Sequence, residues 1–359
     1  MDSGKLPSSP SSLLIIKLSA LGDIVQALPV LNAIKATWPG CQVDWITGEV
    51  GADLLADHPL LRRVLVYPRR RLGRLSRSPF SWPKVLRELS GLKSRLHEGN
   101  YDIAMDLQGL FKSGLICKLS GARIRAGFDK GREMSHLFLN YRLPPYDPDR
   151  HAVLRYLDMA KALGATCEEI NFPIPITKDH VAEAKKLVQK IGAEERRFVI
   201  LIPGTVWSTK KWISSYFAEL SNMIYSGLGL KSVVVGGPMD KGLGRKIRQL
   251  SGSHTEDLTG KTDLKTLAAL FSLAACAVST DTGPMHLAAA SGLRVVALFG
   301  PTAPWRTGPF GTGHVVIRKE MDCSPCFKRS CTHNSCMWTI KPMEVFKSVR
   351  ELCKHSKLK

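Results

Sequence analysis

The chain has 359 residues, 44% of them hydrophobic and 23% charged, which favours two globular domains and excludes an intrinsically disordered protein. Its formal net charge of +20 indicates an anionic partner, such as a nucleic acid, a membrane surface or a phosphorylated substrate. No apolar run approaches the roughly 18 residues that a membrane-spanning helix requires, and no secretory signal is recognisable. We therefore expect a cytoplasmic protein.

The first half of the chain alternates apolar runs with helix-like stretches. Residues 1–12 are rich in serine and proline, which predicts a disordered tail. Apolar residues at helical spacing predict a helix from Asp23 onward, with a kink or a restart at Pro29. Strands are expected at residues 13–18, 42–46, 64–66 and 103–107. This alternation predicts a parallel, doubly wound α/β sheet.

A basic window follows at residues 62–95, with eleven lysines and arginines and one acid, Glu88. Within it, residues 82–97 predict an amphipathic helix. Its apolar face would contain Val85, Leu86, Leu89, Leu92 and Leu96. A helix of this kind suits the surface of an anionic membrane. The alternative is an ordinary amphipathic helix that packs on the sheet.

The second half repeats the α/β pattern. Prolines in residues 171–178 predict an interdomain linker, so the domains would span residues 13–170 and 179–340, followed by a terminal helix at 341–359. Strands are expected at residues 198–202, 232–235, 276–279 and 295–299. Each ends in a turn rich in Gly, Pro, Ser or Thr, which predicts a nucleotide-binding crevice at the carboxyl edge of the sheet.

The segment STDTGPMH at residues 279–286 joins a strand to a helix start, an arrangement typical of phosphate binding. Gly283 would let the backbone approach a ligand closely. Asp281, Thr282 and His286 are candidates for hydrogen bonds to a sugar, a phosphate or a nucleotide. The alternative is a helix cap at Thr280 or Thr282, with His286 facing solvent.

Three further residues are candidates for chemistry or binding. Asp23, at a helix start, is either a general base that faces a cleft or a helix cap. Lys210 would neutralise a diphosphate leaving group, unless it is an ordinary surface lysine. Asp240 would accept hydrogen bonds from a ribose or a base, or it would cap the following helix.

Four of the nine cysteines cluster near the end of the chain, at Cys323, Cys326, Cys331 and Cys336. A C-x2-C pair suits zinc or an iron–sulfur cluster. The later spacings match no common zinc finger, and Pro325 lies inside the pair. The alternative is a packed loop of reduced thiols, and we assign no metal.

Taken together, the motifs resemble glycosyltransferase family 9, the ADP-heptose:lipopolysaccharide heptosyltransferases. The resemblance covers nearly the whole chain after residue 12. Its motifs are KLSALGD at 17–23, DLQGLFKS at 106–113, RAGF at 125–128 with RE at 132–133, PGT at 203–205 with Lys210 and Trp212, GGPMD at 236–240, and DTGPMH at 281–286.

The resemblance implies a GT-B fold, in which two Rossmann-like domains face a central cleft, and an inverting transfer without a required metal or other cofactor. Asp23 would then be the base, and Lys17 would assist near the acceptor or the diphosphate. Lys210 would stabilise the departing ADP, and Asp240 would hold the nucleoside. The heptose and diphosphate would contact the DTGPMH motif through Asp281, Thr282, Gly283 and His286.

The resemblance also implies partners: ADP-heptose, Kdo2-lipid A and the anionic inner face of the inner membrane. Residues 108–155 look like heptosyltransferase I, which adds the first heptose to Kdo, whereas the cysteine tail looks like heptosyltransferase II. We expect type I, because the amino-terminal domain selects the acceptor; type II transfer or another sugar donor is the alternative. A nucleic-acid-binding protein lacks support, since aromatics do not interleave with the charges. A dinucleotide-dependent oxidoreductase also lacks support, because this sequence has no G-x-G-x-x-G motif after its first strand.

Overall fold

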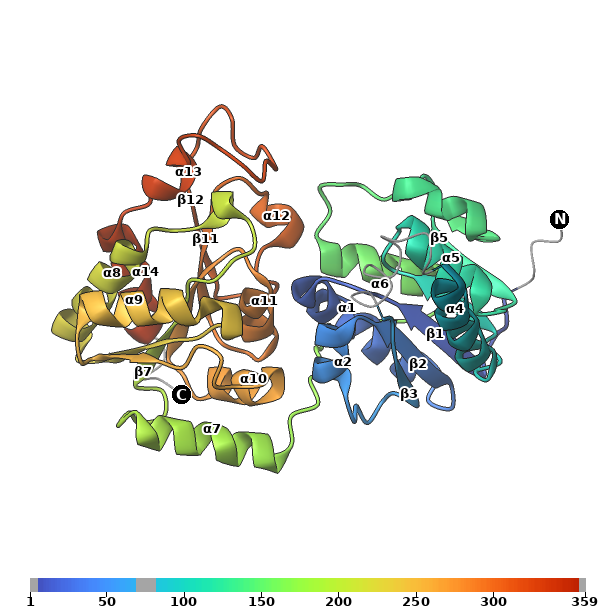
Figure 1. Ribbon diagram of the computed structural model, residues 1–359, viewed down its shortest axis with the longest axis horizontal. Coiled ribbons are helices and arrows are strands. Elements are labelled where there is room, and N and C mark those ends of the chain that lie inside the picture. The colour runs from blue at the N-terminus through green and yellow to red at the C-terminus, as the bar shows by residue number, and fades with distance from the viewer. Residues whose placement is uncertain (1–5, 69–81, 355–359) are drawn as a thin grey trace. The chain divides into compact units, whose positions relative to one another are not determined.

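The computed structural model describes residues 6–68 and 82–354 (Figure 1). The chain divides into two compact units, Met1–Pro175 and Ile176–Lys359. Each unit contains one six-stranded sheet in which every neighbouring pair is parallel. The predicted α/β class with two doubly wound sheets is therefore confirmed.

The sheet of the first unit has the strand order β3-β2-β1-β4-β5-β6. Its central strand, β1, has the sequence SLLII and is buried along its whole length, as expected for a strand covered on both faces. The order reverses between β1 and β4, which is where open α/β sheets bind ligands. The strands are β1 (Ser12–Ile16), β2 (Gln42–Thr47), β3 (Arg63–Val66), β4 (Ile103–Asp106), β5 (Ile124–Phe128) and β6 (Tyr141–Leu143).

The second sheet repeats this plan with the order β12-β11-β10-β7-β8-β9. Counted from the start of the unit, this is again the 3-2-1-4-5-6 order of a dinucleotide-binding fold, and its switch point lies between β7 and β10. The strands are β7 (Phe198–Ile202), β8 (Lys231–Val234), β9 (Thr255–Asp257), β10 (Cys276–Thr280), β11 (Val295–Phe299) and β12 (Val315–Arg318).

Helices connect the strands of both units. In the first unit they are α1 (Leu21–Thr37), α2 (Glu49–Leu55), α4 (Trp82–His97), α5 (Phe111–Leu119), the 3-10 helix η2 (Arg132–Phe138) and α6 (Ala152–Ala162). In the second unit they are α7 (Lys178–Lys190), η3 (Ser208–Lys210), α8 (Ser214–Leu228), η4 (Pro238–Asp240), α9 (Lys241–Ser251), α10 (Leu264–Ser272), α11 (Gly283–Ala290), α12 (Pro304–Thr307), α13 (Ser335–Trp338) and α14 (Pro342–Lys354).

Two local predictions need correction. Helix α1 continues through Pro29 without a restart, because the burial of residues 24–31 outweighs the single N–H that proline removes. The predicted disordered tail is wrong for its last residues, since Ser12 begins β1 and the Ser11 N–H and hydroxyl donate to Asp102 at 2.7 and 2.8 Å. Residues 1–5 and 355–359 lie outside the described residues.

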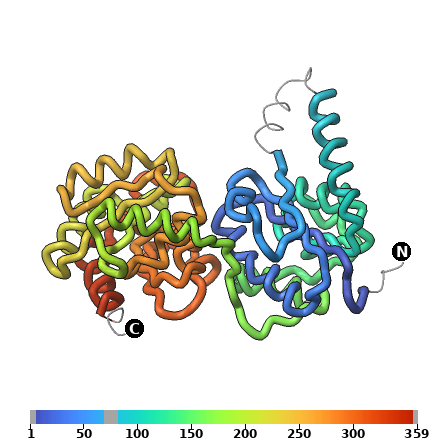
Figure 2. Tube along the Cα trace, turned by 90° about the horizontal axis from the view of Figure 1, so that it is seen from below, coloured from blue at the N-terminus to red at the C-terminus, as the bar shows by residue number. Residues whose placement is uncertain are grey.

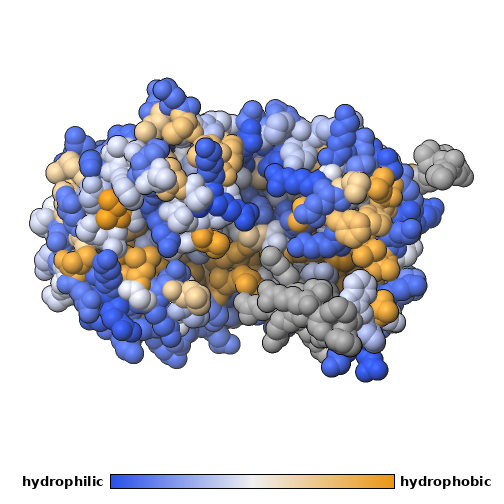
Figure 3. All heavy atoms as spheres, turned by 45° about the horizontal axis from the view of Figure 1, so that its top comes forward, coloured by the Kyte–Doolittle hydropathy of each residue, from blue (hydrophilic) through white to orange (hydrophobic). Residues whose placement is uncertain are grey.

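Side chains at the surface are mostly hydrophilic, and hydrophobic ones occur in small groups on the face that Figure 3 shows. None of the described helices is both long enough and apolar enough to cross a bilayer. Much of the predicted basic window, residues 69–81, lies outside the described residues.

The first two arginines of the basic window are structural. Arg62 and Arg63 both donate to the buried carboxylate of Asp44, at 2.7–3.0 Å, and Tyr101 adds its hydroxyl at 2.6 Å. Burial alone would raise the pKa of Asp44, but the hydrogen bonds from Arg62, Tyr101 and Arg63 outweigh it and lower that pKa. These two charges therefore stabilise the fold and do not extend a surface for anions.

Replacing Asp44 is expected to destabilise the first unit. Asp44→Asn leaves two arginines without their anion, and we expect a loss of about 3 kcal/mol in the free energy of unfolding by urea denaturation. Since the folded-state pKa of Asp44 is lowered, its contribution is present above the unfolded pKa of about 3.9 and is lost as pH falls through the folded value. The variant should therefore lose less stability than the parent between neutral and acidic pH.

An exposed ion pair of the same unit provides the control. Asp158 accepts from Arg150 at 2.5 Å, but both side chains are more than a third exposed. Asp158→Asn should change the free energy of unfolding by less than about 1 kcal/mol. Equal losses in the two variants would contradict the role given to Asp44.

Candidate functional site

Charged residues, most of them predicted site residues, lie at or beyond the carboxyl ends of the strands that flank each switch point. In the first unit, Lys17 and Asp23 lie after β1, and Asp106 ends β4. In the second unit, Lys210 lies beyond β7, and Asp281 follows β10. The strand order therefore brings together loops that are distant in the sequence.

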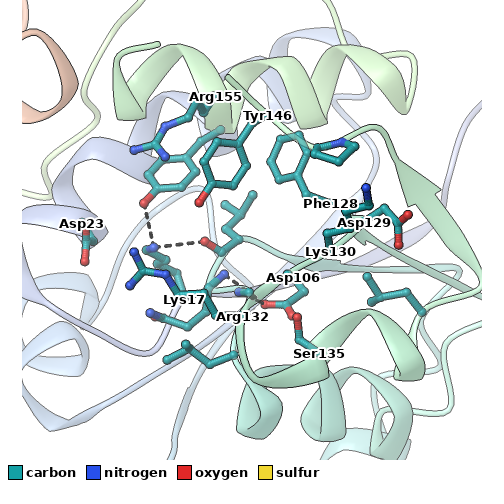
Figure 4. Close-up of a pocket in the computed structure, with 18 of the residues that line it drawn as sticks. Lys17, Asp23, Asp106, Phe128, Asp129, Lys130, Arg132, Ser135, Tyr146 and Arg155 are labelled. Atoms are coloured by element: carbon teal, nitrogen blue, oxygen red, sulfur yellow. Dashed lines mark hydrogen bonds between the residues drawn. The ribbon is translucent and has the colours of Figure 1, made fainter. Parts of the chain in front are cut away.

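The loops of the first unit enclose a cavity of about 410 Å³ (Figure 4). Figure 4 shows Asp23 at one end of it and Asp129 with Lys130 at the other. Charged groups of both signs line the cavity: Lys17, Lys130, Arg132 and Arg155, with Asp23, Asp106 and Asp129. Aromatic rings supply apolar surface beside them: Phe128, Tyr146 and Tyr156. Such a lining suits a polar, anionic ligand with a carbon skeleton.

Lys17 forms a cationic part of this cavity wall. Its side chain is buried, and its Nζ donates to the Leu107 carbonyl at 3.0 Å and to the Tyr156 hydroxyl at 2.7 Å (Figure 4). Burial acts to lower the pKa of Lys17, but Tyr156, Asp23 and Asp106 together raise that pKa above its ordinary value. Lys17 is therefore a fixed positive charge that ties β1 to the loop after β4 and to α6.

Asp106 organises the loop after β4 and was not among the predicted site residues. Its Oδ1 accepts from the N–H groups of Gln108 and Gly109 at 3.0 and 2.9 Å, and its Oδ2 accepts from the Ser113 hydroxyl at 3.0 Å. Gln108 Oε1 in turn accepts from Leu18 N and Ser19 N. Burial raises the pKa of Asp106 in spite of these bonds. The DLQG motif was the sequence signal for this link between two loops.

Asp23 caps its helix and also lines the cavity. It lies in the first turn of α1, where its Oδ2 accepts from the Ala20 N–H at 3.0 Å, so it does cap the helix. The same half-buried carboxylate lines the cavity near Lys17. Its capping bond fixes the carboxylate at the cavity wall and is compatible with catalysis.

The second unit places Lys210 against Asp281. Lys210 Nζ lies 2.6 Å from Asp281 Oδ2, which also accepts from the Thr302 hydroxyl at 2.6 Å. The side chains are only 15% and 7% exposed, so the interpretation of Lys210 as an ordinary surface lysine is wrong. Lys210 also lies 4.5 Å from the centroid of the Trp207 ring.

Asp240 packs between two glycine-containing turns. Its Oδ2 accepts from the Gly237 N–H at 2.9 Å, which caps η4 and leaves the following helix α9 without a side-chain cap. A Cβ at Gly204 would lie 2.6 Å from the Asp240 carboxyl group, and one at Gly236 would lie 2.7 Å from it. The PGT and GGP motifs therefore meet at this carboxylate.

The DTGPMH turn has the predicted strand–turn–helix form, because β10 ends at Thr280 and α11 begins at Gly283. Thr282 is at the N-cap position, but its side chain forms no capping hydrogen bond. His286 is 7% exposed, so the solvent-facing alternative for this histidine is wrong.

The four clustered cysteines are free thiols. Cys323 and Cys331 are exposed, and Cys336 is buried. Within residues 6–68 and 82–354, no three His, Cys, Asp or Glu side chains are placed to hold a metal ion.

Comparison with known proteins identifies the family. The profile described as "Glycosyltransferase family 9 (heptosyltransferase)" matches residues 90–337. Lipopolysaccharide heptosyltransferase 1 of Pseudomonas aeruginosa is 30% identical over 330 residues, which cover 89% of this chain and 87% of that protein. The chain belongs to glycosyltransferase family 9. It is therefore a glycosyltransferase, as its motifs predicted.

Other members of family 9 carry both type designations. Lipopolysaccharide heptosyltransferase 1 of Escherichia coli K12 is 28% identical and covers 85% of the chain and 93% of its own length. Lipooligosaccharide heptosyltransferase 2 of Campylobacter jejuni is 25% identical, with coverages of 94% and 97%. Relatives of either designation therefore match most of this chain.

Solved structures of family 9 share the fold. A family 9 glycosyltransferase of Veillonella parvula superimposes with a TM-score of 0.80 at 22% identity, covering 97% of this chain and 98% of its own. The E. coli heptosyltransferase WaaC with ADP gives 0.75 at 24% identity, with coverages of 95% and 99%. The predicted GT-B fold is confirmed.

Proposed function

We propose that this family 9 enzyme transfers heptose from ADP-heptose to the Kdo of Kdo2-lipid A, with inversion at the transferred carbon. The observation that carries the proposal is that each unit has a site at its own switch point. One is a cavity that contains a carboxylate, Asp23, and the other is a buried lysine, Lys210, held by Asp281. Relatives named lipopolysaccharide heptosyltransferase 1 support the choice of reaction.

The second unit would bind the donor. ADP leaves with a diphosphate charge, and Lys210 would neutralise that charge as the glycosidic bond breaks. The N–H groups at the start of α11, near Thr282 and Gly283, would donate hydrogen bonds to phosphate oxygens, with His286 on the same helix. Asp240 would accept from the nucleoside. The structurally similar E. coli heptosyltransferase WaaC was solved with ADP, which agrees with such a donor.

The first unit would bind the acceptor. Kdo is a sugar acid, and its carboxylate would pair with cations of the cavity such as Arg132 or Arg155. Asp23 would remove the proton from the acceptor hydroxyl as that oxygen attacks the heptose. Lys17 would keep the loop after β1, and with it the Asp23 carboxylate, in place. A base in one unit and a cation for the leaving group in the other supply the two functions that an inverting displacement needs.

Mass spectrometry of the product distinguishes the two acceptors. We expect ADP-heptose and Kdo2-lipid A to yield a product heavier by one heptose, while an acceptor that already carries the first heptose remains unchanged. Transfer only to the heptosylated acceptor would replace the proposal with type II activity. No transfer from ADP-heptose, together with transfer from a different nucleotide sugar, would overturn the donor.

We also propose that α4 attaches the enzyme to the cytoplasmic face of the inner membrane. Its last turns pack in the core through Leu92 and Leu96, whereas Trp82 and Leu86 are 59% and 62% exposed. In Figure 2 the beginning of α4 stands away from the rest of its unit. Lysine and arginine side chains of α4 are also exposed, so this end combines apolar and cationic groups.

Removing the exposed apolar groups of α4 should weaken membrane binding. For Trp82→Ser with Leu86→Ser, we expect at least about tenfold weaker binding to vesicles that contain phosphatidylglycerol, measured by co-sedimentation. The control is Leu250→Ser, which removes a leucine that is 52% exposed from α9 in the other unit. Unchanged binding of the double variant, or the same loss in the control, would contradict the proposal.

A further inference from the structure

Residues 323–338, which we name the cysteine segment, pack directly on the proposed donor site. The segment first contacts η3, the short turn that ends in Lys210. The Ser208 hydroxyl donates to the Arg329 carbonyl at 3.0 Å, and the Thr209 hydroxyl donates to the Lys328 carbonyl at 2.8 Å. Thr209 is only 2% exposed, so its hydrogen bond is shielded from water. Ser208 and Thr209, the two residues before Lys210, are thus fixed to the cysteine segment.

The contact continues on both sides of this turn. The Arg329 guanidinium lies 5.0 Å from the centroid of the Trp207 ring, and the Lys210 ammonium lies 4.5 Å from the same centroid. Beyond Lys210, the buried Asn334 donates through Nδ2 to the Lys211 carbonyl at 3.5 Å. The cysteine segment therefore contacts residues before and after the lysine.

A second set of contacts reaches the loop that carries Thr302, the hydroxyl donor to Asp281. The Phe327 N–H donates to the Pro301 carbonyl at 2.8 Å, and the Ser324 hydroxyl donates to the Gly300 carbonyl at 2.6 Å. A Cβ at Gly300 would lie 2.9 Å from Cys336 Sγ. Only glycine therefore lets the loop after β11 pack this closely against the buried thiol.

We propose that the cysteine segment is a positioning element of the donor site. It fixes Lys210 from one side and Thr302 from the other, so that both groups meet at Asp281. This inference rests on the proposed donor role of Lys210 and Asp281. It gives the cysteine-bearing loop a task that needs no metal, because the contacts come from backbone carbonyls, hydroxyls and one amide.

The consequence concerns donor affinity. A lysine on a flexible stem binds a diphosphate well only when its ammonium is already in place, since ordering it at the moment of binding consumes part of the binding free energy. Weakening the contacts of the cysteine segment should therefore reduce the affinity for ADP and raise the KM for the sugar nucleotide. The KM for the acceptor, which we assign to the first unit, should not change.

Thr209→Val tests the inference with little change of shape. It removes the hydroxyl that donates to the Lys328 carbonyl, and we expect the affinity for ADP, measured by calorimetry, to fall about fivefold to tenfold. Thr209→Ser restores the hydroxyl and should restore the affinity. The matched control is Thr255→Val, a buried threonine of the same unit that is bonded to Ser221 and Ser251. It should lower stability but leave ADP affinity unchanged.

Alkylation of Cys331 is a second test. The Cys331 thiol is exposed, and its Sγ accepts from the Asn334 N–H at 3.4 Å. With iodoacetamide, its sulfur forms a bond to the acetamide carbon, iodide leaves, and the thiol proton passes to the buffer. In a Cys323→Ser background, which removes the other exposed thiol of the segment, the treated protein should bind ADP more weakly, whereas treated Cys323→Ser with Cys331→Ser should bind as before treatment.

The outcomes separate this inference from the proposed function. If Asp281→Asn leaves ADP affinity unchanged, the donor-site assignment is wrong, and the inference fails with it. If Asp281→Asn lowers the affinity but Thr209→Val does not, the donor site stands and the positioning role is overturned. Equal losses in Thr209→Val and Thr255→Val would show a general effect of stability and would also overturn it.

Discussion

Asp23→Asn is expected to reduce kcat by about 10²- to 10⁴-fold and to leave the affinity for ADP nearly unchanged. The amide cannot take the proton of the acceptor hydroxyl, but its oxygen can still accept from the Ala20 N–H, so the cap of α1 is retained. Steady-state kinetics with ADP-heptose and Kdo2-lipid A, together with ADP calorimetry, measure the two effects. Asp23→Ala should lose the same activity and the cap as well.

Glu49 offers a matched control for this prediction. It is the acidic residue in the first turn of α2, as Asp23 is in α1, but it does not line the cavity. Glu49→Gln should cost a few tenths of a kcal/mol in stability and leave kcat unchanged. Parallel losses of kcat and ADP affinity in Asp23→Asn would instead assign Asp23 a structural role.

The central strands could be predicted because their sequences are continuous apolar runs. The strand β7, FVILI, is buried at every position. In an α/β sequence, such a short apolar run has few interpretations other than a buried strand. Three of the four edge strands, β6, β9 and β12, were not predicted in this way. Strand β6 has only three residues, and β9 is Thr-Glu-Asp; each exists because a neighbouring strand offers it hydrogen bonds. These strands are stabilised by the sheet, so their own sequences show little pattern typical of a strand.

The site shows the same division between local and long-range information. A strand, a turn and a helix start identify Asp23 and Asp281 as residues at ligand-binding edges, since these patterns are local. The partner of each charge is not local. The contact of Lys210 with Asp281 depends on the order β10-β7, and the pairing of Arg62 with Asp44 depends on β2 lying beside β3. The sequence therefore predicted the charged residues of the site. It placed Arg62 and Arg63 in a basic window for anions, although they bind Asp44, and it did not identify Asp106.

Lys210→Met is the second change for which we expect a large effect. The methionine keeps an unbranched stem beside Trp207 but removes the cation, and kcat should fall by about 10²- to 10³-fold because the diphosphate charge is no longer neutralised as it develops. Affinity for ADP should also fall, in contrast to Asp23→Asn. The exposed Lys211, next in the chain, provides the control, since Lys211→Met removes a charge without touching Asp281.

The ion pair between Lys210 and Asp281 determines how substitutions of the two residues should combine. In Lys210→Met the buried carboxylate of Asp281 remains, with its hydrogen bond from Thr302, and it would repel the incoming diphosphate. Neutralising it in the double variant Lys210→Met with Asp281→Asn removes that repulsion. The double variant should therefore bind ADP more tightly than Lys210→Met, and the two losses should not add. Strictly additive losses would mean that Lys210 and Asp281 act on the donor independently, in spite of their 2.6 Å contact.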